Sequence, residues 1–131
     1  MRRNMDLIRN LMLKLEAAPM EIGDNVQIAP GYPQIAGIEG TESEIHYHLE
    51  LLRDEGLLDC PKGQPMIGIM FTGLTWKGHD FVDSMRDEKI WRETKESATK
   101  VGGFTAGLLI EIAKALIKAQ LKKLMPGVDF G

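Results

Sequence analysis

One helix and the strand that follows it are specified by the segment Thr41-Glu42-Ser43-Glu44-Ile45-His46-Tyr47-His48-Leu49-Glu50-Leu51-Leu52-Arg53-Asp54-Glu55-Gly56-Leu57-Leu58. Its first four residues form a capping box, in which the Thr41 hydroxyl accepts from the backbone of Glu44 and the Glu44 carboxylate reaches back. Apolar residues then recur at helical spacing, namely Ile45, Leu49 and Leu52. Gly56 stands where a left-handed residue ends a helix. The pattern predicts a helix over 42–55 and a strand that starts at Leu57 and Leu58.

A second helical pattern precedes this segment. Between residues 6 and 17 the apolar positions are helically spaced, and they are Leu7, Ile8, Leu11, Met12 and Leu15. Pro19 marks the end of that helix. Residues 19–40 are interrupted by prolines and glycines, so we expect irregular structure there, with one short strand over 26–29. Whether a short helical turn also lies in this region stays open.

After the capped helix the pattern changes to that of a hairpin and then returns to helix. Residues 61–65 form a turn, and 66–74 are predicted to be the second strand of the hairpin. Thr75 can cap a further helix that turns Phe81, Val82 and Met85 inward and continues, with a break near Asp87, to about residue 97. Gly102 and Gly103 separate it from a last helix over 105–124, which Pro126 stops.

This order of elements resembles a winged helix-turn-helix domain. The block Ile45-x-x-His48-Leu49-x-Leu51-Leu52-x-x-x-Gly56-Leu57-Leu58 is similar to the helix and strand step of many winged-helix regulators. Two further blocks resemble an uncharacterised bacterial and phage family, domain of unknown function 2513: Met5-Asp6-Leu7-Ile8-Arg9, and Leu74-Thr75-Trp76-x-Gly78-His79-Asp80-Phe81-Val82-Asp83-x-x-Arg86-Asp87-x-x-Ile90-Trp91. The similarity covers the first three quarters of the chain and implies a winged-helix fold and a bacterial or mobile-element origin, but no activity.

The expected fold class is therefore α+β and mainly α. A winged-helix domain with a two-stranded wing would occupy 1–99, and a helical oligomerisation segment would occupy 100–131. The length of 131 residues suits one domain with one real core. With 44% hydrophobic and 27% charged residues, the composition is typical of a globular protein.

The bulk charge and the single cysteine limit the function classes. The formal charge is −3 and the isoelectric point about 5.6, whereas a dedicated nucleic-acid binder is usually basic. Cys60 cannot form an internal disulfide, so nothing indicates a secreted, cross-linked fold. The N-terminus has no apolar region after its arginines, and no apolar run reaches the roughly 18 to 20 residues of a membrane span. We expect a cytoplasmic protein.

If the chain binds DNA as helix-turn-helix proteins do, the helix over 42–55 enters the major groove. Its outward stripe is Ser43, Tyr47, Glu50 and Asp54, flanked by His46 and Arg53, and is acidic overall. Affinity for DNA comes mainly from Lys and Arg on phosphates, so this stripe is unusual for such a role. The candidate DNA-binding residues are Arg2, Arg3, Ser43, His46, Tyr47, Arg53 and Lys62.

No reaction centre can be assembled from the sequence. His46 and His48 are two apart, which places them about 200° apart on a helix, so they cannot chelate one ion. His79 and Asp80 have no accompanying ligand cluster, and His79 more simply packs or caps its helix. Cys60 has no base tied to it by spacing. Trp76 and Trp91 are more often core or interface anchors than cofactor partners. We predict no catalytic residues, no metal and no cofactor, although an enzyme that uses His79, Asp80 or Cys60 remains a weak third hypothesis.

The last helix is apolar around most of its circumference. Its polar residues Glu111, Lys114, Lys118 and Lys122 form one narrow stripe. A helix of this kind must be buried on several sides, and the preceding domain is small. We therefore expect self-association through Leu108, Leu109, Ile112, Ala113, Leu116, Ile117, Leu121 and Leu124. Docking into a different protein is the second possibility, and a membrane surface the third.

Two functions follow from these patterns. The first is an oligomeric winged-helix DNA-binding protein of a bacterium or mobile element, which analogy with other winged helices makes a regulator. The alternative is a winged-helix module for protein–protein interaction, which the acidic stripe favours. The partners expected are therefore a second copy of the chain, with double-stranded DNA or another protein as the target.

Overall fold

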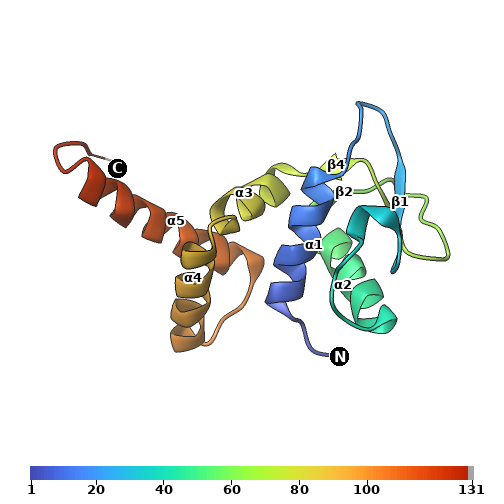
Figure 1. The fold of residues 1–131 in the computed structure, drawn as a ribbon, viewed down its shortest axis with the longest axis horizontal. Coiled ribbons are helices and arrows are strands. Elements are labelled where there is room, and N and C mark those ends of the chain that lie inside the picture. The colour runs from blue at the N-terminus through green and yellow to red at the C-terminus, as the bar shows by residue number, and fades with distance from the viewer. Residues whose placement is uncertain (130–131) are drawn as a thin grey trace. The chain divides into compact units, whose positions relative to one another are not determined.

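The computed structural model describes residues 1–129 and is mainly helical, with small β elements (Figure 1). It groups into two compact units, Met1–Val82 and Asp83–Gly131, which we describe one at a time. The elements in chain order are α1 Met5–Ala17, β1 Val26–Ile28, the 3-10 turn η1 Pro33–Ile35, α2 Glu42–Asp54, β2 Leu58–Asp59, β3 Ile69–Phe71, β4 Gly73–Leu74, α3 Trp76–Met85, α4 Glu88–Val101 and α5 Ala106–Leu124. The expected class, α+β and mainly α, is confirmed. The functional division at residues 99 and 100 stays a prediction.

Helix α1 forms as its apolar spacing predicts. Its cap is Asn4, whose side-chain oxygen accepts from the backbone N–H groups of Asp6 and Leu7 at 3.0 and 3.2 Å. The predicted inward positions are all buried, namely Leu7, Ile8, Leu11, Met12 and Leu15. The following segment contains both the short strand expected there, β1, and a helical turn, η1.

Helix α2 has both of its predicted ends. The Glu44 N–H donates to the Thr41 hydroxyl at 3.1 Å, and the Thr41 N–H donates to the Glu44 carboxylate at 3.2 Å, which completes the capping box. At the other end Gly56 has φ +76°, and the next N–H, that of Leu57, donates back to the Leu52 carbonyl at 3.1 Å. The residues Ile45, Leu49 and Leu52 are buried as predicted.

The four strands make two small antiparallel sheets that share one stretch of chain. β1 pairs with β3 in the register Val26 to Phe71, and β2 pairs with β4 in the register Leu58 to Leu74. The hairpin predicted between the strand at Leu57–Leu58 and the strand that ends at Leu74 is therefore present. Residues 69–74 contact β1 along their first half and β2 along their second half, so this stretch joins the two sheets.

The prediction of one strand over 66–74 was wrong at its start and in its continuity. Residues 66–68 lie outside the strand because Gly68 has φ +72°, and because a Cβ there would lie 2.0 Å from the Ile28 carbonyl oxygen. The side chain of Gln64 also occupies the edge of the strand: it accepts from the Met70 N–H at 3.0 Å and donates to the Met70 carbonyl at 3.1 Å. At Thr72 the strand pairing changes from β1 to β2, and its N–H donates to the Asp59 carbonyl at 2.8 Å.

Thr75 links the end of the hairpin to helix α3. Its hydroxyl accepts from the Gly78 N–H at 3.0 Å, as a helix cap does, and donates to the Gly56 carbonyl at 2.6 Å. Gly78 packs directly on the chain after α2, since a Cβ at this position would lie 2.0 Å from the Leu57 carbonyl oxygen. Phe81 and Val82 are buried as predicted.

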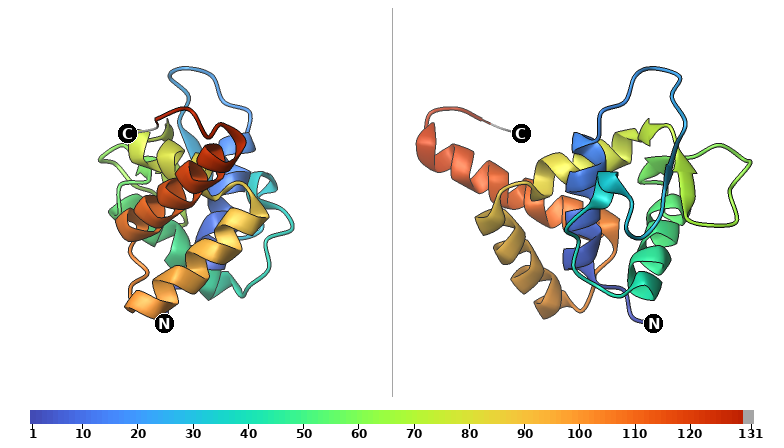
Figure 2. Two further views of the ribbon diagram at one scale, coloured as in Figure 1. Left: turned by 90° about the vertical axis from the view of Figure 1, so that its left-hand side faces the viewer. Right: turned by 45° about the vertical axis from the view of Figure 1, so that its right-hand side comes forward.

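In the second unit, α4 packs against α5, and the two helices cross as seen in Figure 2. The break predicted near Asp87 is present, because the Asp87 carboxylate caps α4 by accepting from the Ile90 N–H at 2.9 Å. α4 runs four residues beyond the predicted end, to Val101, where Gly102 has φ +74°. The Thr105 hydroxyl caps α5 by accepting from the Leu108 N–H at 3.2 Å.

The close approach at Gly78 generates a stability prediction. We expect Gly78→Ala to lower the free energy of unfolding by at least about 2 kcal/mol, because the added methyl group would overlap a backbone carbonyl that cannot rotate away. Gly107→Ala in α5 is the matched control: no atom lies within 4 Å of its added Cβ, so we expect a gain of about 0.5 kcal/mol from helix propensity. Urea unfolding followed by circular dichroism measures both. Equal effects of the two substitutions would contradict the packing argument.

Candidate interaction surface

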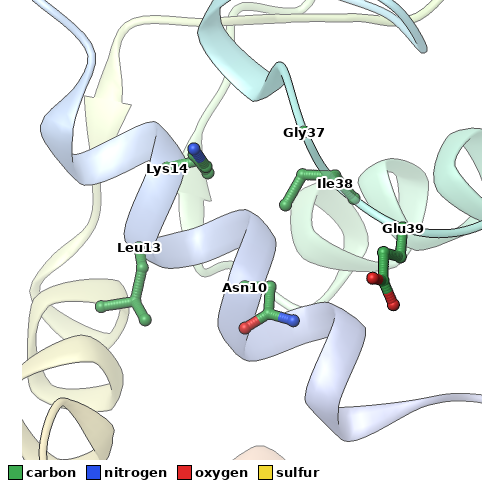
Figure 3. A pocket seen from close by; sticks show the side chains of 6 residues that line it. All are labelled: Asn10, Leu13, Lys14, Gly37, Ile38 and Glu39. Carbon is green, nitrogen blue, oxygen red and sulfur yellow. The ribbon is translucent and has the colours of Figure 1, made fainter.

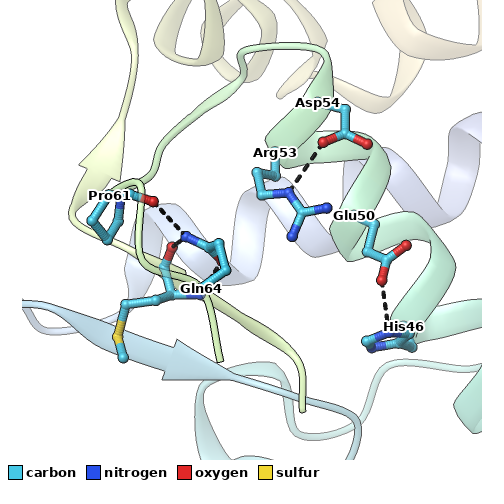
Figure 4. A network of polar contacts seen from close by, with 7 residues as sticks. His46, Glu50, Arg53, Asp54, Pro61 and Gln64 are labelled. Atoms are coloured by element: carbon cyan, nitrogen blue, oxygen red, sulfur yellow. Dashed lines mark hydrogen bonds and ion pairs between the residues drawn. The ribbon is translucent and has the colours of Figure 1, made fainter. Parts of the chain in front are cut away.

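The outward face of α2 pairs two basic side chains with carboxylates of the same helix. His46 Nε2 lies 2.9 Å from the Glu50 carboxylate one turn away, and Arg53 Nε donates to the neighbouring Asp54 carboxylate at 3.1 Å (Figure 4). At the end of the helix the Lys77 ammonium group donates to the Glu55 carboxylate at 2.9 Å. These pairs are half-exposed, so each stabilises the fold only weakly. They nevertheless reduce the positive charge that this face can offer to a phosphate.

The first unit as a whole carries a net negative charge, as the outward face of α2 does. Residues 1–82 contain seven Lys and Arg against twelve Asp and Glu, a formal charge of −5. Residues 83–131 contain nine Lys and Arg against seven Asp and Glu, a formal charge of +2. The bulk value of −3 therefore hides a more acidic first unit. A polyanion that approaches α2 would meet net repulsion at low salt.

A buried histidine connects the N-terminal arm to α2. His48 is 0% exposed, its Nε2 accepts from the Asn4 N–H at 2.8 Å, and its Nδ1 lies 2.7 Å from the Glu44 carbonyl oxygen. Because a carbonyl oxygen only accepts, Nδ1 carries the proton and the ring is the neutral Nδ1–H tautomer. The exposed residues Arg2 and Arg3 therefore begin beside the first turns of α2.

His48 belongs to the block that resembles winged-helix regulators and to the histidine pair excluded as a metal site, but the sequence did not predict this hydrogen-bonding role. The signal was present in its position, because His48 lies between Ile45 and Leu49 on the inward side of the helix. Its ring also meets Tyr47 edge-on, with ring centroids 5.4 Å apart. Tyr47 is half-buried. Ser43, which was also predicted as a DNA-binding residue on this helix, is exposed.

The loop between β2 and β3 presents Lys62 to solvent. Two glutamines hold this loop. The Gln64 amide donates to the Pro61 carbonyl at 2.8 Å (Figure 4). The Gln27 amide, on β1, donates to the Ile67 carbonyl at 2.8 Å. Met66 and Ile67 at its tip are exposed. The loop is thus a fixed projection, with one cation and two apolar side chains.

The residues considered for chemistry do not converge. In residues 1–129 no group of three or more His, Cys, Asp and Glu is placed to hold a metal ion. His79 is exposed on α3. Burial raises the pKa of the Cys60 thiol, with Asp59 and Asp54 adding to the effect and Arg53 opposing it. A thiol held protonated in this way is a poor nucleophile. Trp91 is buried under the Lys95 ammonium group, but Trp76 is 85% exposed and is no core residue.

An open pocket of about 490 Å³ lies between α1 and the segment that follows η1 (Figure 3). Its lining is Asn10, Leu13, Lys14, Gly37, Ile38 and Glu39. Its lining includes one cation, Lys14, and one carboxylate, Glu39. Its chemistry is that of a shallow binding surface.

The candidate interface residues on α5 fall into two groups. Leu109 and Ala113 are fully buried by their own chain, so a second copy could not contact them in this arrangement. The half-buried members are Leu108, Ile112, Leu116, Ile117 and Leu121, and Leu124 is 78% exposed. Among the described residues no helix is long and apolar enough to cross a bilayer.

Comparison with known proteins identifies the family. A family profile described as hypothetical protein (DUF2513) matches residues 2–105. The chain belongs to this family. An uncharacterised protein of Haemophilus influenzae (strain Rd) is 29% identical over 125 residues, which cover 92% of this chain and 99% of that protein. No solved structure matches. The match to DUF2513 ends at Thr105, the residue that caps α5, so the last helix lies outside the profile.

The His48 bridge leads to a second stability prediction. We expect His48→Ala to lower the free energy of unfolding by about 3 kcal/mol, because a buried ring is lost and two backbone groups lose their partner. His46→Ala, on the exposed side of the same helix, should change it by less than about 0.5 kcal/mol. Urea unfolding gives both values. Faster hydrogen exchange at the Asn4 amide in His48→Ala would show that the arm has been released, and unchanged exchange would contradict the bridge.

The raised pKa of Cys60 makes a separate prediction. Because the thiol loses its proton at higher pH than an ordinary cysteine, the thiolate fraction at neutral pH is reduced. Alkylation by iodoacetamide at pH 7 should be slower than that of a cysteine-containing peptide, and its rate should still be rising above pH 9, the ordinary thiol value. Reaction at pH 7 faster than that of the peptide would show an activated thiol instead.

Proposed function

We propose that residues 1–82 form a winged-helix domain that works as a protein-interaction module, with α2 as its binding face. The support for the fold is the element order: α1, β1, the turn η1, α2, and then a hairpin whose loop projects as a wing. In this reading α2 occupies the place of the recognition helix and the loop at Lys62 is the wing.

The observation that carries the interaction function is the charge arrangement on α2. The helix exposes carboxylates, and its basic side chains, His46 and Arg53, are paired with them. The counterion release that drives DNA binding needs several free Lys or Arg, whereas the candidate face offers three, namely Arg2, Arg3 and Lys62. A basic surface of another protein fits this face better. Tyr47 would supply the aromatic contact that protein interfaces favour.

The test is a comparative pull-down from lysate of the native host. We expect Tyr47→Ala and Glu50→Lys each to reduce capture of one defined partner at least tenfold, because they remove an anchor and reverse a charge on the same face. Tyr32→Ala, which changes a half-buried tyrosine outside α2, is the matched control. The captured protein should carry a basic surface and bind purified wild-type protein directly. The same proteins captured by wild type and both variants would exclude α2 as the binding face.

DNA binding is the second candidate, and one specific observation favours it. The Asn4–His48 hydrogen bond places Arg2 and Arg3 beside α2, where an arm could follow a groove next to a helix. With three free cations, the affinity should fall about 40-fold between 50 and 200 mM salt. A mobility shift with a mixed-sequence duplex measures this.

The same assay decides between the two candidates. A shift at 50 mM salt that is lost in the combined variant Arg2→Ala, Arg3→Ala and Lys62→Ala, but kept in Lys89→Ala, would replace the protein-interaction proposal by DNA binding. Absence of any shift at low salt would remove the DNA candidate.

A further inference from the structure

The pocket between α1 and the segment after η1 has two different walls, both within the first unit. The wall on α1 is one face of the helix, because residues three and four apart lie side by side: Asn10, Leu13 and Lys14. The facing wall is residues 37–39. Gly37 keeps this wall open, since no atom would lie within 4 Å of a Cβ there. The volume of about 490 Å³ is that of a small-molecule site, for which roughly 300 to 1,000 Å³ is usual.

The two charged groups that line this pocket are unpaired. Within residues 1–129, neither the Lys14 ammonium group nor the Glu39 carboxylate forms an ion pair or a side-chain hydrogen bond. On α2, by contrast, opposite charges pair at 2.9 and 3.1 Å. Figure 3 shows Lys14 and Glu39 apart from each other, with Asn10 and Ile38 between them. An occupant that carries both signs of charge could therefore satisfy both groups.

Between the two charges the pocket offers apolar contact and one neutral polar group. Leu13 and Ile38 are half-buried, so an apolar group placed against them would leave water with them. The Asn10 side-chain amide has no partner in the described part of the chain, and it can both donate and accept. A site for an anion, a site for a cation and an apolar contact together match an α-amino acid, which carries a carboxylate, an ammonium group and a side chain on one carbon.

We propose that this pocket binds a free α-amino acid with an apolar side chain. The Lys14 ammonium group binds the carboxylate of the ligand, the Glu39 carboxylate binds its ammonium group, and its side chain lies against Leu13 and Ile38. Both charged groups are exposed, so water competes for them, and we expect a dissociation constant of about 1 mM. None of the lining residues belongs to α2, so the proposal does not depend on the partner proposed for that helix.

The test is a titration of the isotope-labelled full chain with L-leucine, followed by NMR spectra of the backbone amides. We expect saturable shifts at residues 10–14 and 37–39. Two analogues each lack one charge: N-acetyl-L-leucine has no ammonium group, and L-leucinamide has no carboxylate. Each should bind at least tenfold more weakly than leucine, because each loses one hydrogen bond between charged groups.

Two variants assign the charges to their partners. Lys14→Gln should weaken leucine binding at least tenfold but leave leucinamide unchanged, because leucinamide has no carboxylate that could lose its partner. Glu39→Gln should weaken leucine binding by the same factor but leave N-acetyl-L-leucine unchanged. Lys62→Gln, in the loop between β2 and β3, is the matched control and should leave all three affinities unchanged. All three positions are exposed, and circular dichroism checks folding.

Three results would overturn the proposal. The first is the absence of saturable shifts at these residues when leucine is raised well above the expected dissociation constant. The second is equal binding of leucine and both analogues, which indicates an apolar contact alone. The third is tight binding of N-acetyl-L-leucine together with no effect of Glu39→Gln, which replaces the amino-acid site by an anion site at Lys14.

Discussion

The contact between the end of α2 and the start of α3 is the constraint on which the first unit depends. The Thr75 hydroxyl donates to the Gly56 carbonyl at 2.6 Å, the Thr75 N–H donates to the Leu57 carbonyl at 3.2 Å, and Gly78 leaves no space above that carbonyl. These bonds close the hairpin at its base. Because β2 and β4 are only two residues long, ladder hydrogen bonds alone would not hold them.

The stretch 69–74 connects the hairpin to β1, because it pairs with both β1 and β2. Residues 69–71 pair with β1 and residues 73–74 with β2, so the loop before them must leave the sheet abruptly. Gly68 allows this departure, and the Gln64 amide satisfies the Met70 backbone in place of a strand neighbour. The result is a projecting loop that depends on one glycine and on the side chains of Gln64 and Gln27. Its polar backbone groups are satisfied by side chains, as strand edges require.

The fold and the surface charge of the first unit point to different kinds of partner for α2. The winged-helix fold proposed for the first unit would permit DNA contact through α2, but fold does not determine function. On the α2 face, His46 and Arg53 are paired with Glu50 and Asp54, and the first unit carries five more negative than positive side chains. The arm bonded to His48 carries Arg2 and Arg3 toward this helix, while Lys77 at its other end is paired with Glu55. Electrostatics therefore favours a basic protein partner.

The sequence by itself determined the elements whose signals are local. Capping at Thr41, the αL position at Gly56, and the apolar spacing of α1 and α2 each depend on residues within a few positions of one another, so they could be predicted. The acidic face of α2 followed for the same reason.

Only the tertiary structure decided the long-range features. These are the 44-residue span from Asn4 to His48, the point at which the strand pairing changes, and which half of α5 its own chain covers. Each depends on groups far apart in the chain. Period and propensity carry no information about which distant backbone atom a side chain will meet.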